Sequence, residues 1–426
     1  MNFDLKKTLS PYLAEKDIET VSQAMEQTPV SSFIFDGSPK SLSLIREEYP
    51  DIQPDENDSF ICHFRKDENQ LGKSLLHFAG AFYIMDSSSA CISKYLAKLI
   101  PANPLVLDMC AAPGGKSIAF ALRRKDSLIS ACDISYQRAL EIAKNTDRLG
   151  LTNVFSFPLD PVEISLPSMF DLIILDAPCS GSGMFRKELK MLDDWSEEKV
   201  QRLLPVQHLL LEKAYSLVKK GGIIAYSTCS LSLEEDECQV KDFLSRHNDV
   251  QEVRISPDSS LREGKYGYHL LPGISQGEGI YFSFLKKESG DSYIPKEIKY
   301  KSSFHCGSLK SFDYRKNTFL LDRMFTELSK LPFIVPGIKV NDDSPHPKCQ
   351  FDHAYCKVDE SLPRIELTKK QALDFVSGQE ITVESNLENS IVILSYKGFR
   401  LGFGKKVNSK IKNYLPKGLR SQLIED

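Results

Sequence analysis

The segment Leu105-Val-Leu-Asp-Met-Cys-Ala-Ala-Pro-Gly-Gly-Lys116 contains a strand, a turn of small residues and the start of a helix. The apolar run Leu105–Asp108 predicts the strand, and Ser117–Arg124 has the composition of the helix. Small residues let a ligand approach the backbone, and a helix start favours a carboxylate or a phosphate. The turn lacks the spacing of G-x-G-x-x-G dinucleotide sites and the first glycine of G-x-x-x-x-G-K-[ST] phosphate loops. We therefore predict another kind of nucleotide loop, formed by Cys110, Ala111, Ala112, Pro113, Gly114, Gly115 and Lys116.

Further apolar runs follow this segment and alternate with helical stretches. The runs are Leu128–Asp133, Val154–Phe157, Leu172–Asp176 and Ile223–Ser227. Such alternation is typical of a parallel sheet with helices on both faces. The predicted fold class is therefore α/β, with a Rossmann-like, doubly wound sheet. In these sheets the fourth and fifth strands usually lie beside the first, and ligands bind at the carboxyl ends of the strands.

The chain of 426 residues is too long for one ordinary core, so we expect two or three domains. The alternating pattern spans residues 76–287, which form the predicted ligand-binding domain. Residues 1–75 form a first block that supports it. The polar residues 288–302 are interpreted as a linker. Residues 303–426 form a last domain with mixed helix and strand signals.

The composition restricts the class of protein. Hydrophobic residues make up 41% of the chain and charged residues 26%, as in ordinary globular proteins. The formal net charge is only −4, so binding to a nucleic acid would require a local basic patch. The sequence has no apolar run of membrane-spanning length and no apolar signal region in residues 1–12. The ten cysteines include no Cys-x-x-Cys pair, so we expect reduced thiols in a cytoplasmic protein.

Two aspartates follow successive predicted strands. Asp133 ends the second strand at nearly the distance, about 20 residues after the glycine turn, at which an acid binds a ribose hydroxyl. Asp160 follows the third strand and is expected near the adenine end of a nucleotide. A lone aspartate is usually a solvated surface residue, but two acids at neighbouring strand ends favour ligand binding.

Two cysteines follow the last two strands of the pattern. The fourth strand leads into Asp176-Ala-Pro-Cys-Ser-Gly-Ser-Gly183 and the fifth into Ser227-Thr-Cys-Ser230. Neighbouring strands lie about 4.8 Å apart, so Asp176, Cys179 and Cys229 are expected to converge beside the ligand. A free cysteine is more often a small buried apolar residue. We interpret six others in that way: Cys62, Cys91, Cys110, Cys132, Cys238 and Cys306.

These motifs resemble those of the RNA cytosine-5 methyltransferase family, the Sun-type enzymes. Asp108–Lys116 resembles the family's cofactor loop, and the segments that begin at Asp176 and Ser227 resemble its Pro-Cys and Thr-Cys motifs. The likeness is strong over residues 79–287 and looser at the C-terminus. It points to bacterial enzymes that modify small-subunit ribosomal RNA and carry an extra C-terminal domain. One departure is Met85, where the family usually has glutamine.

The resemblance implies an enzyme that transfers a methyl group from S-adenosylmethionine to carbon 5 of cytosine in RNA, in particular small-subunit ribosomal RNA. It implies that Cys229 is the nucleophile, that Cys179 assists product release and that Arg186-Lys187 contacts RNA. It also implies a set of residues around the cofactor: Cys110 to Lys116, Asp133, Asp160 and Asp176. The chemistry is consistent, because a thiolate added to carbon 6 enables carbon 5 to attack a methyl group. Asp176 would hold the exocyclic amine of the base.

The last residues carry a basic run. From Lys397 to Arg420 the chain has eight cations and no acid, interleaved with Phe399, Phe403 and Tyr414. A charge run is usually a solvated face, but cations with aromatic faces suit RNA. With the looser family likeness, this run predicts an RNA-binding, β-rich domain of the PUA kind. We expect the protein to be a monomer with no membrane partner.

Several alternatives remain. His346, Cys349, His353 and Cys356 have ligand-like spacings, but structural zinc sites usually have tighter, paired knuckles, so we predict no metal. A DNA cytosine-5 methyltransferase would use the Pro-Cys cysteine as its nucleophile and would not need Cys229. A substrate in tRNA, or an inactive RNA-binding assembly factor of the ribosome, is a further alternative.

Overall fold

The computed structural model describes residues 3–65, 70–300, 307–341, 349–421 and 423. Its largest sheet has nine strands in the order β11-β12-β13-β9-β8-β5-β6-β7, and β10 pairs with β13. Strands β5 to β9 run parallel, whereas β13 runs antiparallel to β9. The bounds are β5 Leu105–Asp108, β6 Leu128–Asp133, β7 Val154–Pro158, β8 Phe170–Asp176, β9 Val218–Thr228, β10 Val250–Glu252, β11 Leu261–Glu263, β12 Tyr268–Leu270 and β13 Ile280–Lys287. The predicted doubly wound α/β fold is confirmed, and β8 lies between β5 and β9 as expected.

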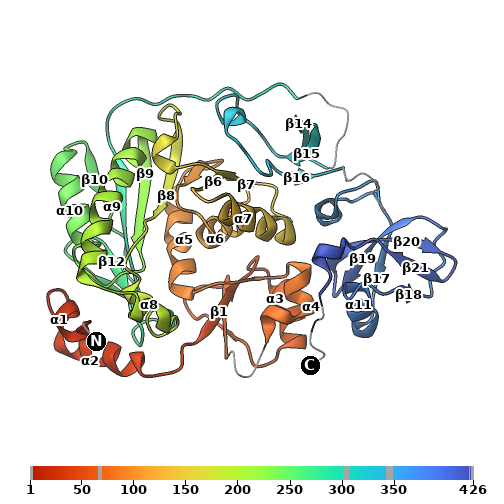
Figure 1. Cartoon of the computed structure of the whole chain (residues 1–426), viewed down its shortest axis with the longest axis horizontal. Helices are drawn as coiled ribbons and strands as arrows, with labels where there is room; N and C mark the ends of the chain where they lie inside the picture. Colours follow the sequence, from red (N-terminus) through yellow and green to blue (C-terminus); the bar gives the residue numbers. More distant parts are fainter. Residues whose placement is uncertain (1–2, 66–69, 301–306, 342–348, 422, 424–426) are drawn as a thin grey trace.

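Helices cover both faces of this sheet (Figure 1). Alternate residues of a strand point to opposite faces. In β5, Leu105 and Leu107 pack in one core with residues of α9, whereas Val106 packs in another core with residues of α5, α6 and α7. The helices are α5 Ser87–Leu99, α6 Gly115–Arg123, α7 Tyr136–Leu149, α8 Leu189–Asp193, α9 Glu197–Leu217 and α10 Glu237–Arg246. Burial on both faces explains why the strands appear in the sequence as unbroken apolar runs.

The N-terminal block has its own four-stranded sheet in the order β2-β3-β1-β4. This sheet ends with β4 just before α5, so it leads directly into the main sheet. Its elements are α1 Leu5–Leu9, α2 Glu15–Met25, β1 Ser31–Ile34, α3 Pro39–Glu48, β2 Gln53–Pro54, β3 Ile61–Phe64, η1 Leu71–Lys73, α4 Leu75–Ala79 and β4 Tyr83–Ile84.

The C-terminal third contains two sheets. Strands β14-β15-β16 form the first, and Phe333, which lies between β15 and β16 in the sequence, packs on Phe155 and Phe157 of the main sheet. The second sheet has the order β17-β19-β20-β21-β18. The elements are β14 Lys310–Tyr314, β15 Asn317–Leu321, η4 Leu328–Lys330, β16 Ile338–Lys339, η5 His353–Lys357, β17 Arg364–Glu366, α11 Lys369–Val376, β18 Ile381–Thr382, β19 Ile391–Tyr396, β20 Phe399–Val407, β21 Lys410–Asn413 and η6 Lys417–Leu419.

The first and last parts of the chain share a core. Phe33 and Phe82 of the N-terminal block lie in the same apolar cluster as Phe375 and Leu401 of the second C-terminal sheet. The ammonium group of Lys357 fastens this junction by donating to the backbone oxygen of Ala79 at 2.8 Å. Figure 1 shows the five-stranded sheet beside α3 and α4, at the far end of the molecule from α9 and α10. The five-stranded C-terminal sheet is therefore packed against the N-terminal block.

Candidate active site

The predicted cofactor loop lies at the carboxyl edge of the main sheet. Gly114 precedes α6 and has φ of 106°, in the left-handed region that favours glycine. The backbone N–H of Ala111 donates to the carbonyl of Cys132 at 2.8 Å, which ties the loop to β6. A Cβ atom on Gly115 would lie 3.3 Å from Cε of Met85, so Met85 packs closely over the turn. The loop is therefore held open at the helix start, where its backbone is accessible to a ligand.

Both predicted acids lie at the same edge. The carboxylate of Asp133 accepts from the N–H of Ser135 at 3.0 Å and lies 3.4 Å from the guanidinium of Arg138. The carboxylate of Asp160 accepts from the N–H of Val162 at 3.1 Å, and the neighbouring N–H of Leu159 donates to the carbonyl of Asp133. These bonds orient the two carboxylates at adjacent strand ends.

The site has cofactor-facing features that the sequence analysis did not single out. Ile134 is 65% exposed and Tyr136 is 55% exposed, directly after Asp133. Arg138 donates to the carbonyl of Ala112 at 3.1 Å and so links the loop to Asp133. The buried Oδ1 atom of Asp108 has no hydrogen-bond partner in the described part of the chain, and burial raises the pKa of this carboxyl to about 7. Ile134 and Tyr136, two apolar residues directly after a strand end, are the sequence signal that could have revealed this part of the site.

The residues present fit S-adenosylmethionine, the cofactor implied by the resemblance. Its ribose hydroxyls, exocyclic amine and ammonium are donors, and Asp133, Asp160 and Asp176 supply acceptors at successive strand ends. Its carboxylate suits the start of α6. Its flat adenine suits the exposed apolar surface of Ile134.

The structure brings the two predicted cysteines together. Asp176 and Ser227 are in register on β8 and β9, and the loops that follow place Sγ of Cys179 2.9 Å from Sγ of Cys229. Both cysteines are free thiols. The backbone N–H of Cys229 also donates to Sγ of Cys179 at 3.2 Å.

Asp176 connects the cysteines to the cofactor loop. Its Oδ1 accepts from the hydroxyl of Ser227 at 2.9 Å, and its Oδ2 lies 2.7 Å from Nζ of Lys116. The carboxylate remains 37% exposed. The predicted convergence of Asp176, Cys179 and Cys229 beside the loop is therefore observed.

The surroundings of Cys179 hold its thiol in the protonated form. The hydrogen bond with Cys229, burial and the nearby negative charges of Glu235 and Asp176 raise the pKa of Cys179 well above its usual value. Cys179 therefore retains its proton and can donate it to the sulfur of Cys229. Elsewhere, burial raises the pKa of Cys62 and of Cys91 to about 12, which keeps these thiols unreactive.

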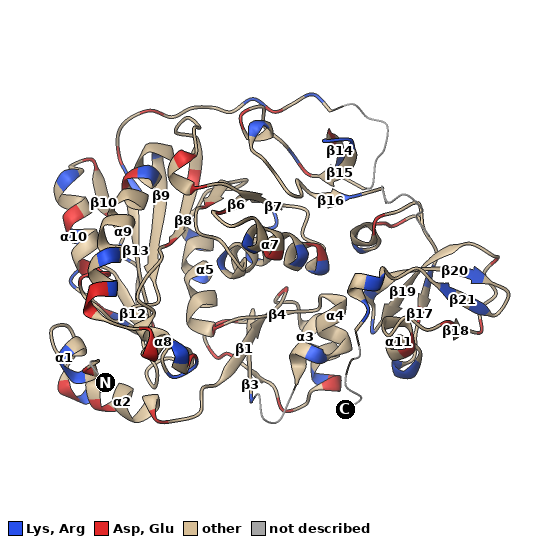
Figure 2. Cartoon of the chain, viewed as in Figure 1, with Lys and Arg blue, Asp and Glu red and all other residues tan. Residues whose placement is uncertain are grey.

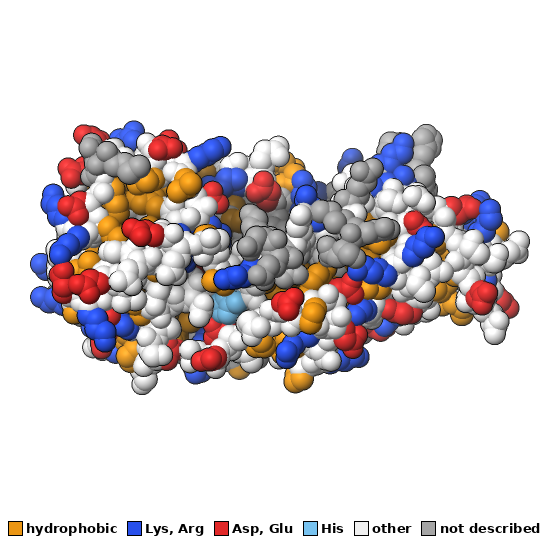
Figure 3. Space-filling view, turned by 90° about the horizontal axis from the view of Figure 1, so that it is seen from below, with side chains coloured by type: hydrophobic (Ala, Val, Ile, Leu, Met, Phe, Trp, Pro, Cys, Tyr) orange, Lys and Arg blue, Asp and Glu red, His pale blue; other side chains and the backbone are white. Residues whose placement is uncertain are grey.

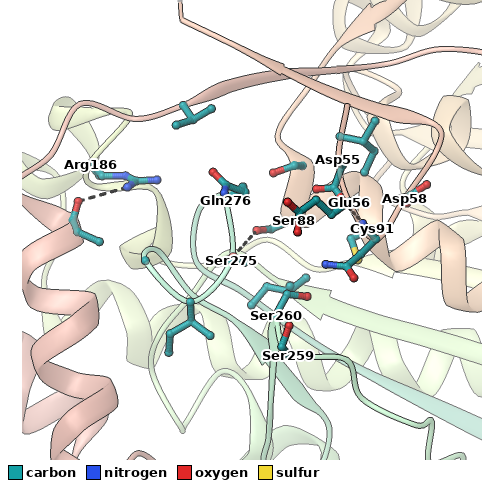
Figure 4. A pocket seen from close by; sticks show the side chains of 18 of the residues that line it. Asp55, Glu56, Asp58, Ser88, Cys91, Arg186, Ser259, Ser260, Ser275 and Gln276 are labelled. Atoms are coloured by element: carbon teal, nitrogen blue, oxygen red, sulfur yellow. Dashed lines mark hydrogen bonds between the residues drawn. The ribbon is translucent and has the colours of Figure 1, made fainter. Parts of the chain in front are cut away.

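Arg186, expected to contact RNA, is instead bonded inside the protein. Its guanidinium lies 2.8 Å from Oε1 of Glu278 and is 6% exposed, so that expectation is wrong for Arg186. Lys187 is 31% exposed. Arg186 borders a polar pocket of about 370 Å³ between the N-terminal block, α5 and residues 273–276, where the hydroxyls of Ser88 and Ser275 are hydrogen-bonded (Figure 4). The described residues that line this pocket include none of the predicted site residues.

The basic C-terminal run is only partly available to a ligand. Lys397, Arg400 and Lys410 are bound to carboxylates of Glu47, Glu360 and Glu380, respectively. Lys405, Lys412 and Lys417 are exposed. Figure 2 shows Lys and Arg along β20 and β21, whereas Figure 3 shows charges of both signs interspersed over another face.

Phe403 does not present its ring to RNA. It is 2% exposed and packs against Phe351 and Tyr355, so the expectation of base stacking is wrong at this residue. The alternation of Phe399, Leu401 and Phe403 along β20 was the sequence signal for an inward-facing row.

The metal alternative is not supported by side-chain geometry. The described residues contain no group of three or more His, Cys, Asp or Glu side chains arranged to hold a metal ion. Cys349 and Cys356 are buried in an apolar cluster, and burial lowers the pKa of His353 to about 3. His346 lies outside the described residues.

Among the residues that the structure describes, no helix combines the length and apolarity needed to cross a membrane.

Comparisons with known proteins identify the family. A family model described as 16S rRNA methyltransferase RsmB/F matches residues 98–286, and one described as the RsmF PUA domain matches residues 362–421. The ribosomal RNA small subunit methyltransferase F of Shewanella piezotolerans is 30% identical over 390 residues, covering 83% of this chain and 82% of the relative. That of Aeromonas salmonicida is 29% identical over 399 residues, with coverages of 83% and 82%.

Solved structures share the fold. A methyltransferase homologue from Pyrococcus horikoshii has a TM-score of 0.57 and 26% identity, over 67% of this chain and 96% of that chain. NSun6 from the same organism has a TM-score of 0.56 and 17% identity, over 67% and 98% of the two chains. The β-rich C-terminal domain is thus of the PUA kind, as predicted. The chain belongs to the RsmB/F family of S-adenosylmethionine-dependent 16S rRNA methyltransferases.

Proposed function

We propose that this protein methylates carbon 5 of a cytosine in small-subunit ribosomal RNA, with Cys229 as the nucleophile and Cys179 as the residue that assists release. The observation that carries the proposal is the contact of 2.9 Å between the two thiols, together with the raised pKa of Cys179. A proton held on Cys179 leaves Cys229 as the sulfur that can react as a thiolate.

The proposed first step is addition of the Cys229 thiolate to carbon 6 of the target cytosine. A carbon–sulfur bond forms, and the electron pair of the 5,6 double bond becomes available at carbon 5. S-adenosylmethionine, when bound, would supply an electrophilic methyl group on its sulfonium sulfur, and that sulfur would leave as a neutral thioether when carbon 5 takes up the methyl group. Asp176, held by Ser227 and Lys116, accepts from the exocyclic amine of the base and orients it.

The proposed last step restores the aromatic ring. Carbon 5 loses its proton to solvent, the carbon–sulfur bond breaks, and Cys229 leaves as a thiolate. The S–H group of Cys179 donates to the departing sulfur and stabilises its charge, which assists release. This role requires the protonated form of Cys179, in agreement with its raised pKa.

The C-terminal domain is proposed to hold the RNA outside the catalytic site. Its exposed Lys405, Lys412 and Lys417 are suited to phosphates, and recognition by phosphate contacts leaves the target base free to turn into the site. We propose that the enzyme acts as a cytoplasmic monomer, since its acceptors and both thiols come from one chain.

A trapping assay tests the cysteine roles. The Cys179→Ala protein is mixed with S-adenosylmethionine and small-subunit ribosomal RNA and run on a denaturing gel. We expect a protein–RNA adduct to accumulate. The adduct should be absent when the same protein also carries Cys229→Ala. An adduct that forms with Cys229→Ala protein but not with Cys179→Ala protein would refute these roles and support the mechanism of DNA cytosine-5 methyltransferases.

A further inference from the structure

A buried carboxylate joins the two cysteine loops. Glu235 is fully buried. Its Oε1 accepts from the backbone N–H of Ser180 at 2.9 Å and from the side-chain amide of Gln207 at 3.1 Å. Its Oε2 accepts from the hydroxyls of Ser180 at 2.5 Å and of Ser230 at 2.7 Å. All four contacts are donors, which matches a group that only accepts.

These donors come from the residues that fix the thiols. Ser180 follows Cys179, and Ser230 follows Cys229. Gln207, on α9, also donates to the carbonyl of Pro178 at 2.9 Å, so it holds the other side of the Cys179 loop. Glu235 thus bridges the loop after β8 and the loop after β9, and it adds to direct contacts between them such as the N–H of Gly183 donating to the carbonyl of Cys229 at 2.9 Å.

The negative charge of Glu235 also acts on the thiol of Cys179. A buried carboxylate is costly unless fully hydrogen-bonded, so a neutral glutamine would be the cheaper way to join two loops. The groups that act electrostatically on Cys179 are Cys229 and Tyr226 from β9 and its loop, Asp176 from β8, and Glu235. α9 contributes the neutral Gln207. The negative charge of Glu235 disfavours a thiolate at Cys179.

We propose that Glu235 is a positioning residue that sets the spacing of the two thiols and assigns the proton to Cys179. This inference rests on the proposed function, since it matters only if the two cysteines have different roles. Glu235 would not touch the RNA base itself and would act through Ser180, Ser230 and Gln207.

The test compares Glu235→Gln with Glu234→Gln. Glu234 is the exposed neighbouring carboxylate and accepts a hydrogen bond from the hydroxyl of Ser232. We expect Glu235→Gln to lower kcat by about 100-fold with the KM for RNA nearly unchanged, because misplacing reacting groups by about 1 Å has this effect. Glu234→Gln should retain the parent kcat.

The pH dependence of Cys179 alkylation distinguishes a positioning role of Glu235 from a general loss of structure. Iodoacetamide alkylation of Cys179, followed by peptide mass spectrometry, should begin about one pH unit lower in Glu235→Gln than in the parent, because a negative charge has been removed. An unshifted profile, or a kcat within threefold of the parent, would overturn the proposal.

Two further variants keep the proposal testable if Glu235→Gln does not fold. Ser180→Ala and Ser230→Ala each remove one hydroxyl that donates to Glu235, together with that hydroxyl's contacts to neighbouring serines, and leave the carboxylate in place. Each should lower kcat roughly tenfold or less, the amount associated with one lost hydrogen bond of about 1 kcal/mol. Parent-like kcat in both would contradict the proposal. Full activity of Cys229→Ala would instead refute the proposed function, independently of the Glu235 results.

Discussion

The carboxyl edge of the main sheet and the C-terminal domain were both predicted to bind, but their side chains are used differently. At the sheet edge, Asp133, Asp176 and Cys229 lie at the ends of neighbouring strands, beside the loop, as their positions in the sequence indicated. In the C-terminal domain, Lys397 and Arg400 are engaged with carboxylates and Phe403 is buried. Position on a strand specifies where a side chain lies, whereas a run of charge does not specify which cations remain free.

The largest expected effect concerns the sheet edge. Cys229→Ser should lower methyl transfer by about 10⁴-fold or more, as for loss of a nucleophile in other covalent enzymes. Transfer of radiolabelled methyl groups to small-subunit ribosomal RNA measures this effect. Cys238→Ser, at an exposed cysteine on α10, is the matched control and should be fully active. Substantial activity in Cys229→Ser would show that Cys229 is not the nucleophile, and the sheet edge would then lose the role given to it in this comparison.

The next effect concerns the C-terminal domain. Replacing the exposed Lys405, Lys412 and Lys417 by alanine should weaken RNA binding by about 30-fold and reduce the slope of log affinity against log salt by roughly three. Filter binding over a range of salt concentrations measures both quantities. The control is Lys397→Ala with Lys410→Ala, whose ammonium groups already contact Glu47 and Glu380. Equal losses of RNA affinity in the two variants would show that pairing with a carboxylate does not decide which of these lysines bind RNA.

A smaller effect is expected in the cofactor loop. Gly114→Ala places a side chain at φ of 106°, and this left-handed backbone costs about 1–2 kcal/mol. If the loop relaxes to relieve the strain, the dissociation constant of S-adenosylmethionine should rise roughly tenfold. Calorimetry checks this expectation. Gly221→Ala is the control, because Gly221 also has a positive φ but has no atom within 4 Å of an added Cβ. It should leave cofactor affinity unchanged, and a similar loss there would contradict the role given to the loop.

The sequence was informative where local pattern determines position. The apolar runs predicted β5 to β9, and parallel pairing then brought Asp176, Cys179 and Cys229 together. Glu235 was not found, because its importance depends on how α9 presents Gln207 to the cysteine loops. The core shared by Phe33 and Leu401 was not predictable either, since no local pattern tells which distant apolar faces pack together.

The smallest effect tests the junction that links the two regions. The carboxylate of Glu48, on α3, lies 2.7 Å from Nζ of Lys369 and accepts from the hydroxyl of Tyr396 at 2.8 Å. Burial raises the pKa of this carboxyl, but the hydrogen bonds from Lys369 and Tyr396 outweigh burial, so the pKa lies below its ordinary value of 4.5. The contribution of Glu48 to stability is thus present above pH 4.5 and is lost as the pH falls through the lowered pKa.

Glu48→Gln should therefore lower the free energy of unfolding by no more than about 1 kcal/mol at neutral pH, and the difference should vanish in acid. Thermal unfolding followed from pH 7 to below pH 4 measures this convergence. Glu47→Gln is the control, since Glu47 is 58% exposed and forms its salt bridge with Lys397 at the surface. If Glu48→Gln were as stable as the parent at neutral pH, the junction would depend on its apolar core rather than on this carboxylate. The C-terminal domain would then be held beside the catalytic part by packing, which acid does not titrate.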